Sequence, residues 1–213
     1  SISEQQANEL VCLRQSIPAA ESDNPFYRCF EGGMLTLNAF IRKVPDRVVY
    51  WGTSGQRITD SYHFDACCMK ELLDYSRLLH GKDIRGQLTP PSFEDIKTNI
   101  QFHYDTIRKY ASSTGRSIYS FGWLLDIARC IYTLRTGKII SKTAAGEWAL
   151  QNCLFHNITA LETALEVRKN PQKYLESAEL QALSGKLGNA IQQYADVLEK
   201  ELKTTSFVGV CTF

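Results

Sequence analysis

The chain has 213 residues, enough to bury a core in one compact domain or in a domain with an appended fragment, but too few for two large domains. Its 24 Lys and Arg residues nearly balance its 23 Asp and Glu residues, so a net charge of +1 gives no reason to expect a nucleic-acid or membrane-surface partner. It has no apolar run of the ~20 residues that a membrane span needs, and its start lacks the basic and then apolar pattern of a secretion signal, so we expect a cytoplasmic protein. Its seven cysteines contain no C-x-x-C pair, so no thiolate zinc site is expected.

Residues 1–60 are predicted to form a small α/β domain. Their Ser-Glu-Gln-Gln start is typical of a capping box and predicts a helix from about Glu4 to Gln15. Two glycines then precede an imperfect alternation from Met34 to Ile41, and a second β-rich run, Arg47 to Trp51, follows a Pro-Asp turn. We therefore expect two short strands, which need a partner because an isolated strand pair is only marginally stable.

Residues 61–213 show helical periodicity, which predicts a bundle of about five or six helices. The first helix is expected from Asp65, its N-cap, to His80, with a glycine at its end. A Pro-Pro-Ser segment at residues 90–92 is typical of the next helix start, and apolar residues then recur every three or four positions to Tyr110.

The segment from Ile118 to Leu134 is apolar on nearly every side, so we expect it to be the central, buried helix. The next helix is predicted to start at Ser141 or Thr143 and to continue to Asn170, where a proline follows. A last core-facing helix is predicted from apolar residues spaced by three or four, namely Leu187, Ile191, Tyr194, Leu198 and Leu202.

The connection after the central helix is a candidate anion site. Gly137 ends that helix, and Arg135 and Lys138 flank the end, where cations stabilise the negative pole of the helix dipole. The following helix begins with unpaired N–H groups and has Lys142 beside them, an arrangement suited to phosphate. From these residues alone, an ordinary αα-hairpin with capping Gly and Ser and solvated lysines is the commoner structure.

The stretch LLDIARCIYTLRTGKIISKTAAGEWAL, residues 124–150, resembles the signature of the C-terminal helical domain of aminoglycoside nucleotidyltransferases, the adenylyltransferases that modify streptomycin and spectinomycin. In that family an Arg-x-x-Tyr-(Ser/Thr) helix continues into Thr-Gly-Lys-Ile, a Ser/Pro-Lys step and Ala-Ala-x-Trp-Ala. The chain departs from this pattern where Gly146 and Glu147 put two residues between Ala145 and Trp148. A weaker likeness extends from Val48 to about Leu202. The matching residues are Arg129, Tyr132, Thr133, Thr136, Gly137, Lys138, Ile139, Lys142, Ala144, Ala145, Trp148 and Ala149.

The resemblance implies transfer of AMP from Mg-ATP to a drug hydroxyl, an antibiotic-resistance activity, in a cleft between an N-terminal nucleotidyltransferase domain and this helical domain. It implies that Lys142 meets the ATP phosphates and that Arg129 helps to order the cleft. ATP and magnesium are the cofactors it implies. The expected fold is mainly α, a helical bundle preceded by a small α/β remnant of the nucleotidyltransferase domain.

The family's metal motif is not found. The resemblance implies a Gly-Ser and a later Asp-x-Asp on neighbouring strand ends, because two close carboxylates hold the magnesium ions of adenylyl transfer. The sequence contains no Asp-x-Asp. Asp60 and Asp65, after a Gly-Thr-Ser-Gly run, are five residues apart and are interpreted as turn and cap residues. We therefore expect no metal site here, a chain that lacks ~60 to 80 residues of the full enzyme, and no adenylyl transfer by the chain alone.

The other candidate site residues follow from chemistry and resemblance. The family places a general base on the strand after the first helix, and Glu31 lies in the corresponding region; a solvated glutamate before a Gly-Gly turn is the alternative. An aminoglycoside is a polycation, so its pocket needs acids and an aromatic surface. The candidates are Asp126, Glu147 and Trp123, whereas Trp148 is expected in the core. Residues 112–119 contain no acid, so a substrate other than an aminoglycoside, or no substrate, stays open.

A second hypothesis is a non-catalytic helical binding or interaction protein derived from the same family. Such a protein would use the face left by the missing domain to pair with itself or with another chain. An apolar patch on that face would favour a homodimer.

Overall fold

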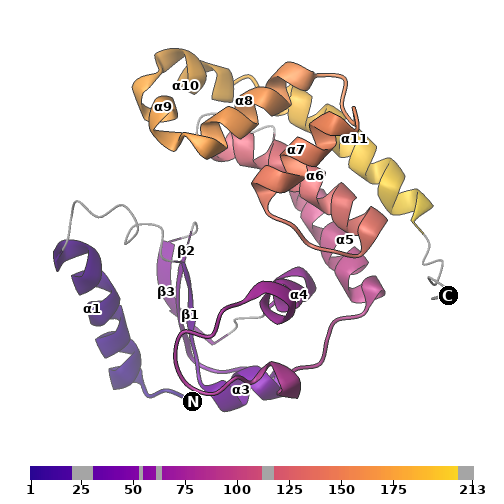
Figure 1. Ribbon diagram of the computed structural model, residues 1–213. Helices are drawn as coiled ribbons and strands as arrows, with labels where there is room; N and C mark the ends of the chain where they lie inside the picture. Colours follow the sequence, from indigo (N-terminus) through magenta and orange to yellow (C-terminus); the bar gives the residue numbers. More distant parts are fainter. Residues whose placement is uncertain (21–30, 53–54, 61–63, 112–117, 206–213) are drawn as a thin grey trace. The chain divides into compact units, whose positions relative to one another are not determined.

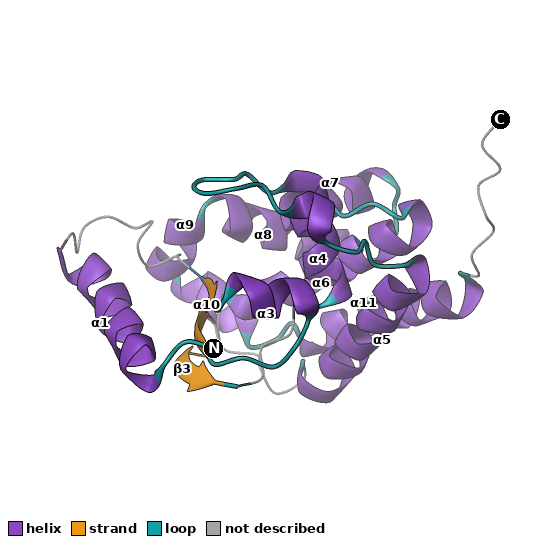
Figure 2. Ribbon diagram, turned by 90° about the horizontal axis from the view of Figure 1, so that it is seen from below, coloured by secondary structure: helices purple, strands orange, loops and turns teal. Residues whose placement is uncertain are grey.

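The structure, a computed structural model, divides into two compact units (Figure 1). The N-terminal unit comprises residues 1–65 and 77–89, and the helical unit comprises residues 66–76 and 90–213. Helix predominates and strands form one small sheet (Figure 2), which confirms the predicted mainly α fold. Within the described ranges, no helix has the length and apolarity needed to cross a membrane. These ranges are residues 1–20, 31–52, 55–60, 64–111 and 118–205.

The first helix of the N-terminal unit is α1 (Glu4–Ala20). The Gln6 N–H donates to Ser3 Oγ at 3.1 Å, and the Ser3 N–H donates to Gln6 Oε1 at 2.9 Å. These two bonds confirm the predicted capping box. The helix continues to Ala20, five residues past the expected end at Gln15, although Pro18 lies within this extension.

A three-stranded antiparallel sheet has the order β1 (Gly32–Met34), β2 (Val48–Gly52) and β3 (Gly55–Thr59). Val49 and Trp51 of β2 form a small buried core with Ala7 of α1. The predicted strand at β2 is therefore confirmed. Strand β3 was not predicted, because most of its residues are exposed and polar and give no apolar alternation.

The predicted strand from Met34 to Ile41 is wrong beyond its first residue, because the chain turns into α3 (Leu37–Arg42). The Thr36 hydroxyl accepts the first-turn N–H of this helix and donates to Asp46 Oδ2 at 2.6 Å. Hydrogen bonds from Ser1 and from Thr36 hold the pKa of Asp46 well below its usual range. A buried carboxylate thus fixes the threonine that starts α3.

The helical unit is built around α6, whose residues Leu124, Ile127, Ala128 and Ile131 are fully buried. Helices α5, α7, α8 and α11 all pack against α6, as expected for the apolar segment from residue 118. The helices of this unit are α4 (Ala66–Tyr75), α5 (Phe93–Tyr110), α6 (Tyr119–Thr136), α7 (Lys142–Gln151), α8 (Ile158–Lys169), α9 (Pro171–Glu176), α10 (Ala178–Ser184) and α11 (Gly188–Thr204).

One helix start agrees with the sequence and one helix end does not. Ser92 caps α5 in a capping box with Asp95, as the Pro-Pro-Ser segment predicts. Helix α4 ends at Tyr75 rather than at His80, and residues 77–89, with the short 3-10 helix η1 (Arg85–Gln87), belong to the N-terminal unit.

The predicted continuous helix from Ser141 to Asn170 is wrong, because α7 ends at Gln151 and α8 starts at Ile158. Cys153 has φ +50°, a conformation that a helix does not contain. Asn157 then starts α8, since its Oδ1 accepts the Ala160 N–H at 3.2 Å. Apolar residues continue through this break at helical spacing, so the sequence pattern does not reveal it.

The short helices α9 and α10 were not predicted. Pro171 was interpreted only as a stop, but it occupies the first turn of α9, where a missing N–H costs nothing. The Ser177 hydroxyl accepts the Leu180 N–H at 3.2 Å and so caps α10.

Candidate functional site

The corner between α6 and α7 has the predicted caps. Gly137 ends α6 in a left-handed conformation, with φ +67°, and its N–H donates to the Thr133 carbonyl at 2.8 Å. Ser141 starts α7, because its Oγ accepts the Ala144 N–H at 3.1 Å. Lys142 is therefore the first residue of α7, at the positive end of the helix dipole.

Two cations from consecutive helices meet one carboxylate at this corner. Lys142 Nζ lies 2.8 Å from Asp126 Oδ2, and Arg129 Nη2 lies 3.3 Å from Asp126 Oδ1. The Asp126 side chain is 11% exposed, whereas those of Lys142 and Arg129 are 29% and 31% exposed. We call these three residues the corner cluster. Its formal charge is +1, with the carboxylate largely buried and the cations partly open to solvent.

The cations of the corner cluster keep capacity for a further anion. A lysine ammonium has three N–H donors and a guanidinium has five. One hydrogen bond from each to Asp126 leaves several donors on each group, and both side chains are partly exposed. The residues therefore fit a phosphate group beside the start of α7.

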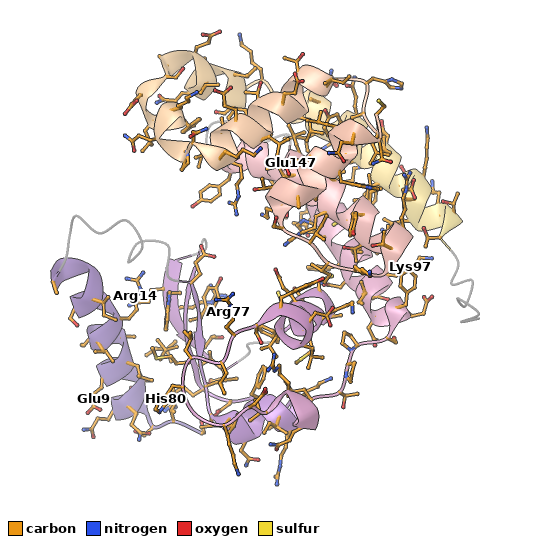
Figure 3. The ribbon with its side chains drawn as sticks, viewed as in Figure 1. Glu9, Arg14, Arg77, His80, Lys97 and Glu147 are labelled. Carbon is orange, nitrogen blue, oxygen red and sulfur yellow. The ribbon has the colours of Figure 1, made fainter. Side chains whose placement is uncertain are left out.

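The remaining predicted site residues of the helical unit have other partners. Glu147 lies on α7 (Figure 3) with its side chain 46% exposed, and its Oε1 accepts from Lys169 Nζ at 2.6 Å. Trp123 is half-buried on α6, with its ring stacked on that of His103 at a centroid distance of 5.7 Å. Neither contact joins these side chains to the corner cluster. A substrate role for Asp126, Glu147 or Trp123 stays a prediction.

Glu31 belongs to the N-terminal unit and lies, exposed, immediately before β1. Its predicted role as a general base stays a prediction. The acid-free loop at residues 112–119 lies outside the described residues except for its last two, as does the centre of the Gly-Thr-Ser-Gly run, residues 53–54.

Helix α7 lies close to its neighbours because it carries small residues. Ala145, Gly146 and Ala149 are buried, and α7 packs against both α6 and α8. A Cβ atom at Gly146 would lie only 2.7 Å from Leu125 Cδ2 and 2.9 Å from Leu165 Cδ2. Gly146, one of the two residues at which the chain departs from the family signature, therefore permits the close packing of α7 against α6 and α8.

Cys130 lies on α6 one residue after Arg129 and is buried. Burial, and then the negative charge of Asp126, raises the pKa of the Cys130 thiol well above its usual range. Cys130 is therefore protonated at neutral pH and does not provide a thiolate nucleophile.

The described residues do not fit a magnesium site. Nowhere in the described part of the chain do three His, Cys, Asp or Glu side chains lie close enough together to hold a metal ion. The carboxylate of Asp126 is already engaged by two cations. We therefore derive no step through a metal.

The pairing within the corner cluster was not predicted. Asp126 and Arg129 are three residues apart on one helix, a spacing that brings oppositely charged side chains together and that the sequence displays. Lys142 is 16 residues from Asp126, and only the turn between α6 and α7 brings its ammonium to the carboxylate.

Taken together, the fold and the corner cluster define a helical domain with paired cations at a helix start. Residues 96–200 match the family model described as aminoglycoside adenylyltransferase, C-terminal domain. This span contains the whole of α6, α7 and α8, and so the corner cluster. The matched segment, residues 96–200, is therefore similar to the aminoglycoside adenylyltransferase C-terminal domain family, as the signature within it indicated. Comparison with curated proteins and with solved structures finds no significant match.

Proposed function

We propose that the corner cluster binds the triphosphate of ATP, and that the helical unit is the nucleotide- and substrate-binding half of an adenylyltransferase. The observation that supports this most is that Lys142, at the start of α7, and Arg129 of α6 share the Asp126 carboxylate within the segment that matches the family. The reaction is transfer of AMP from ATP to a hydroxyl group. Antibiotic resistance is the biological role that this reaction would serve.

Three features of the corner act together on a polyanion. The first N–H groups of α7 have no partner within the helix, and the dipole favours negative charge there. Lys142 adds a mobile ammonium, and Arg129 adds a planar guanidinium that can bind two phosphate oxygens at once. Together they hold the phosphates at a fixed place relative to α6 and α7, which orients the group to be transferred.

An aminoglycoside-like polycation is the substrate that we propose. Glu147 is partly exposed on α7 and can accept a hydrogen bond from a substrate amine if its bond to Lys169 opens. The half-buried ring of Trp123 can contact a sugar face. Asp126 is the least available of the three candidates, since two cations already occupy both of its oxygens. Glu31 is the proposed acceptor of the hydroxyl proton.

Titration of ATP into the full chain by calorimetry tests this function. We expect binding by the wild-type chain and a loss of about tenfold to hundredfold in affinity for Lys142→Ala, because a hydrogen bond to a charged group contributes about 1.5–3 kcal/mol. Lys138→Ala is the matched control, since Lys138 is an exposed lysine of the same corner and its loss changes the net charge equally. Equal affinities of the wild type and both variants would refute the proposal.

A further inference from the structure

The Asp126 carboxylate occupies the two cations that the proposed function assigns to phosphate. We infer that Asp126 is an intramolecular anion that competes with the phosphates for Lys142 and Arg129 and so restrains the affinity of the site. This inference rests on the proposed function and deepens it. It assigns to Asp126 a regulatory role in anion binding in place of contact with the substrate.

The geometry shows how fully the carboxylate engages the cations. Each Asp126 oxygen accepts one hydrogen bond, at 2.8 Å from Lys142 and at 3.3 Å from Arg129. The carboxylate is fixed because it lies in the middle of the buried helix α6, one turn before Arg129. An incoming phosphate therefore meets two cations whose charge is already half neutralised.

Two opposite effects of Asp126 on phosphate binding can be compared. By holding Lys142 and Arg129 in place, Asp126 favours binding, because the ligand need not immobilise these side chains itself. For two side chains, the avoided loss of conformational entropy raises the binding constant by at most about a hundredfold. The carboxylate also repels the ligand. At an effective dielectric constant of about 20, one unit charge about 5 Å away weakens binding by roughly two hundredfold.

The repulsion grows with each charge on the ligand, but the ordering gain does not. A triphosphate brings several negative charges to the corner, so repulsion exceeds ordering and removal of the Asp126 charge should tighten binding. Inorganic phosphate brings fewer charges and should gain less. If Asp126 only positioned the cations, its removal would weaken the binding of both ligands.

The test is a calorimetric titration of sodium tripolyphosphate, and separately of inorganic phosphate, into the full chain. We expect Asp126→Asn to bind tripolyphosphate at least tenfold more tightly than the wild type does, with a smaller gain for phosphate. Glu166→Gln is the matched control, since it removes one exposed acid from α8 that pairs with Lys173 instead. It should stay within about twofold of the wild type.

The outcomes separate this inference from the proposed function. If the wild type binds and Asp126→Asn binds equally or more weakly, the inference alone is overturned. An equal gain in affinity from Glu166→Gln would overturn it too. No binding by either the wild type or Asp126→Asn contradicts the proposed function as well. Circular dichroism checks that Asp126→Asn folds, and Asp126→Thr, a second neutral variant, replaces it in the titration if it does not.

Discussion

Gly146→Val is expected to destabilise the helical unit by about 3 kcal/mol or more, because α7 has no room for a side chain there. The first added carbon alone would lie 2.7 Å from Leu125 Cδ2 and 3.1 Å from Leu165 Cγ. Both leucines are buried in the core, so neither can move into solvent. The valine methyl groups would add to this overlap and push α7 away from α6 and α8.

The measurement is urea unfolding followed by far-ultraviolet circular dichroism. Gly122→Ala is the control, because Gly122 is also inside a helix but a Cβ atom there would have no neighbour within 4 Å. It should stabilise the protein by about 0.5–1 kcal/mol through helix propensity alone. If both variants changed stability in the same direction, close packing of α7 would not be the reason for Gly146.

Tyr194→Ala is expected to cost about 3–5 kcal/mol of unfolding free energy. Tyr194 of α11 is buried, and its ring stacks on that of Phe155 with 3.7 Å between centroids. Its hydroxyl donates to the carbonyl of Asn157, the residue that starts α8. The tyrosine therefore joins α11 to the connection between α7 and α8, and its loss would leave a large cavity.

Tyr194→Phe separates the ring from the hydroxyl and should cost about 1 kcal/mol. Burial raises the pKa of Tyr194 above the usual value of 10. Since the unfolded phenol loses its proton first, this residue's contribution to stability is full below pH 10 and decreases as the pH rises further. The difference between wild type and Tyr194→Phe in urea unfolding should therefore shrink above pH 10. A difference that stayed constant to pH 11 would contradict the burial of the hydroxyl.

Features that depend on a few neighbouring residues were predictable from the sequence. Ser92, Gly137 and Ser141 have the expected capping roles, because a cap is a contact between a residue and its own next turn. The apolar segment around Ile127 is the buried centre of the unit for a similarly simple reason: only a helix surrounded by others can bury every face.

Features that depend on tertiary contacts were not predictable. The pattern from Met34 fits a strand about as well as it fits a helix, and Thr36, held by Asp46 ten residues later, decides for α3. The break after α7 depends on the backbone at Cys153 and on the Asn157 cap, while the apolar spacing continues through it. At the candidate site, the positions of Lys142 and Arg129 followed from the signature, but their shared carboxylate required the fold.

Titration of ATP into the 15N-labelled chain, followed by NMR of its N–H groups, tests most directly the claim that the corner of α6 and α7 binds a triphosphate. We predict the largest shifts at the amides of Lys142, Thr143 and Ala144 and at the side-chain Nε–H of Arg129, and their disappearance in Lys142→Ala. An absence of shifts at millimolar ATP, or shifts centred on other helices with the start of α7 unchanged, would contradict it.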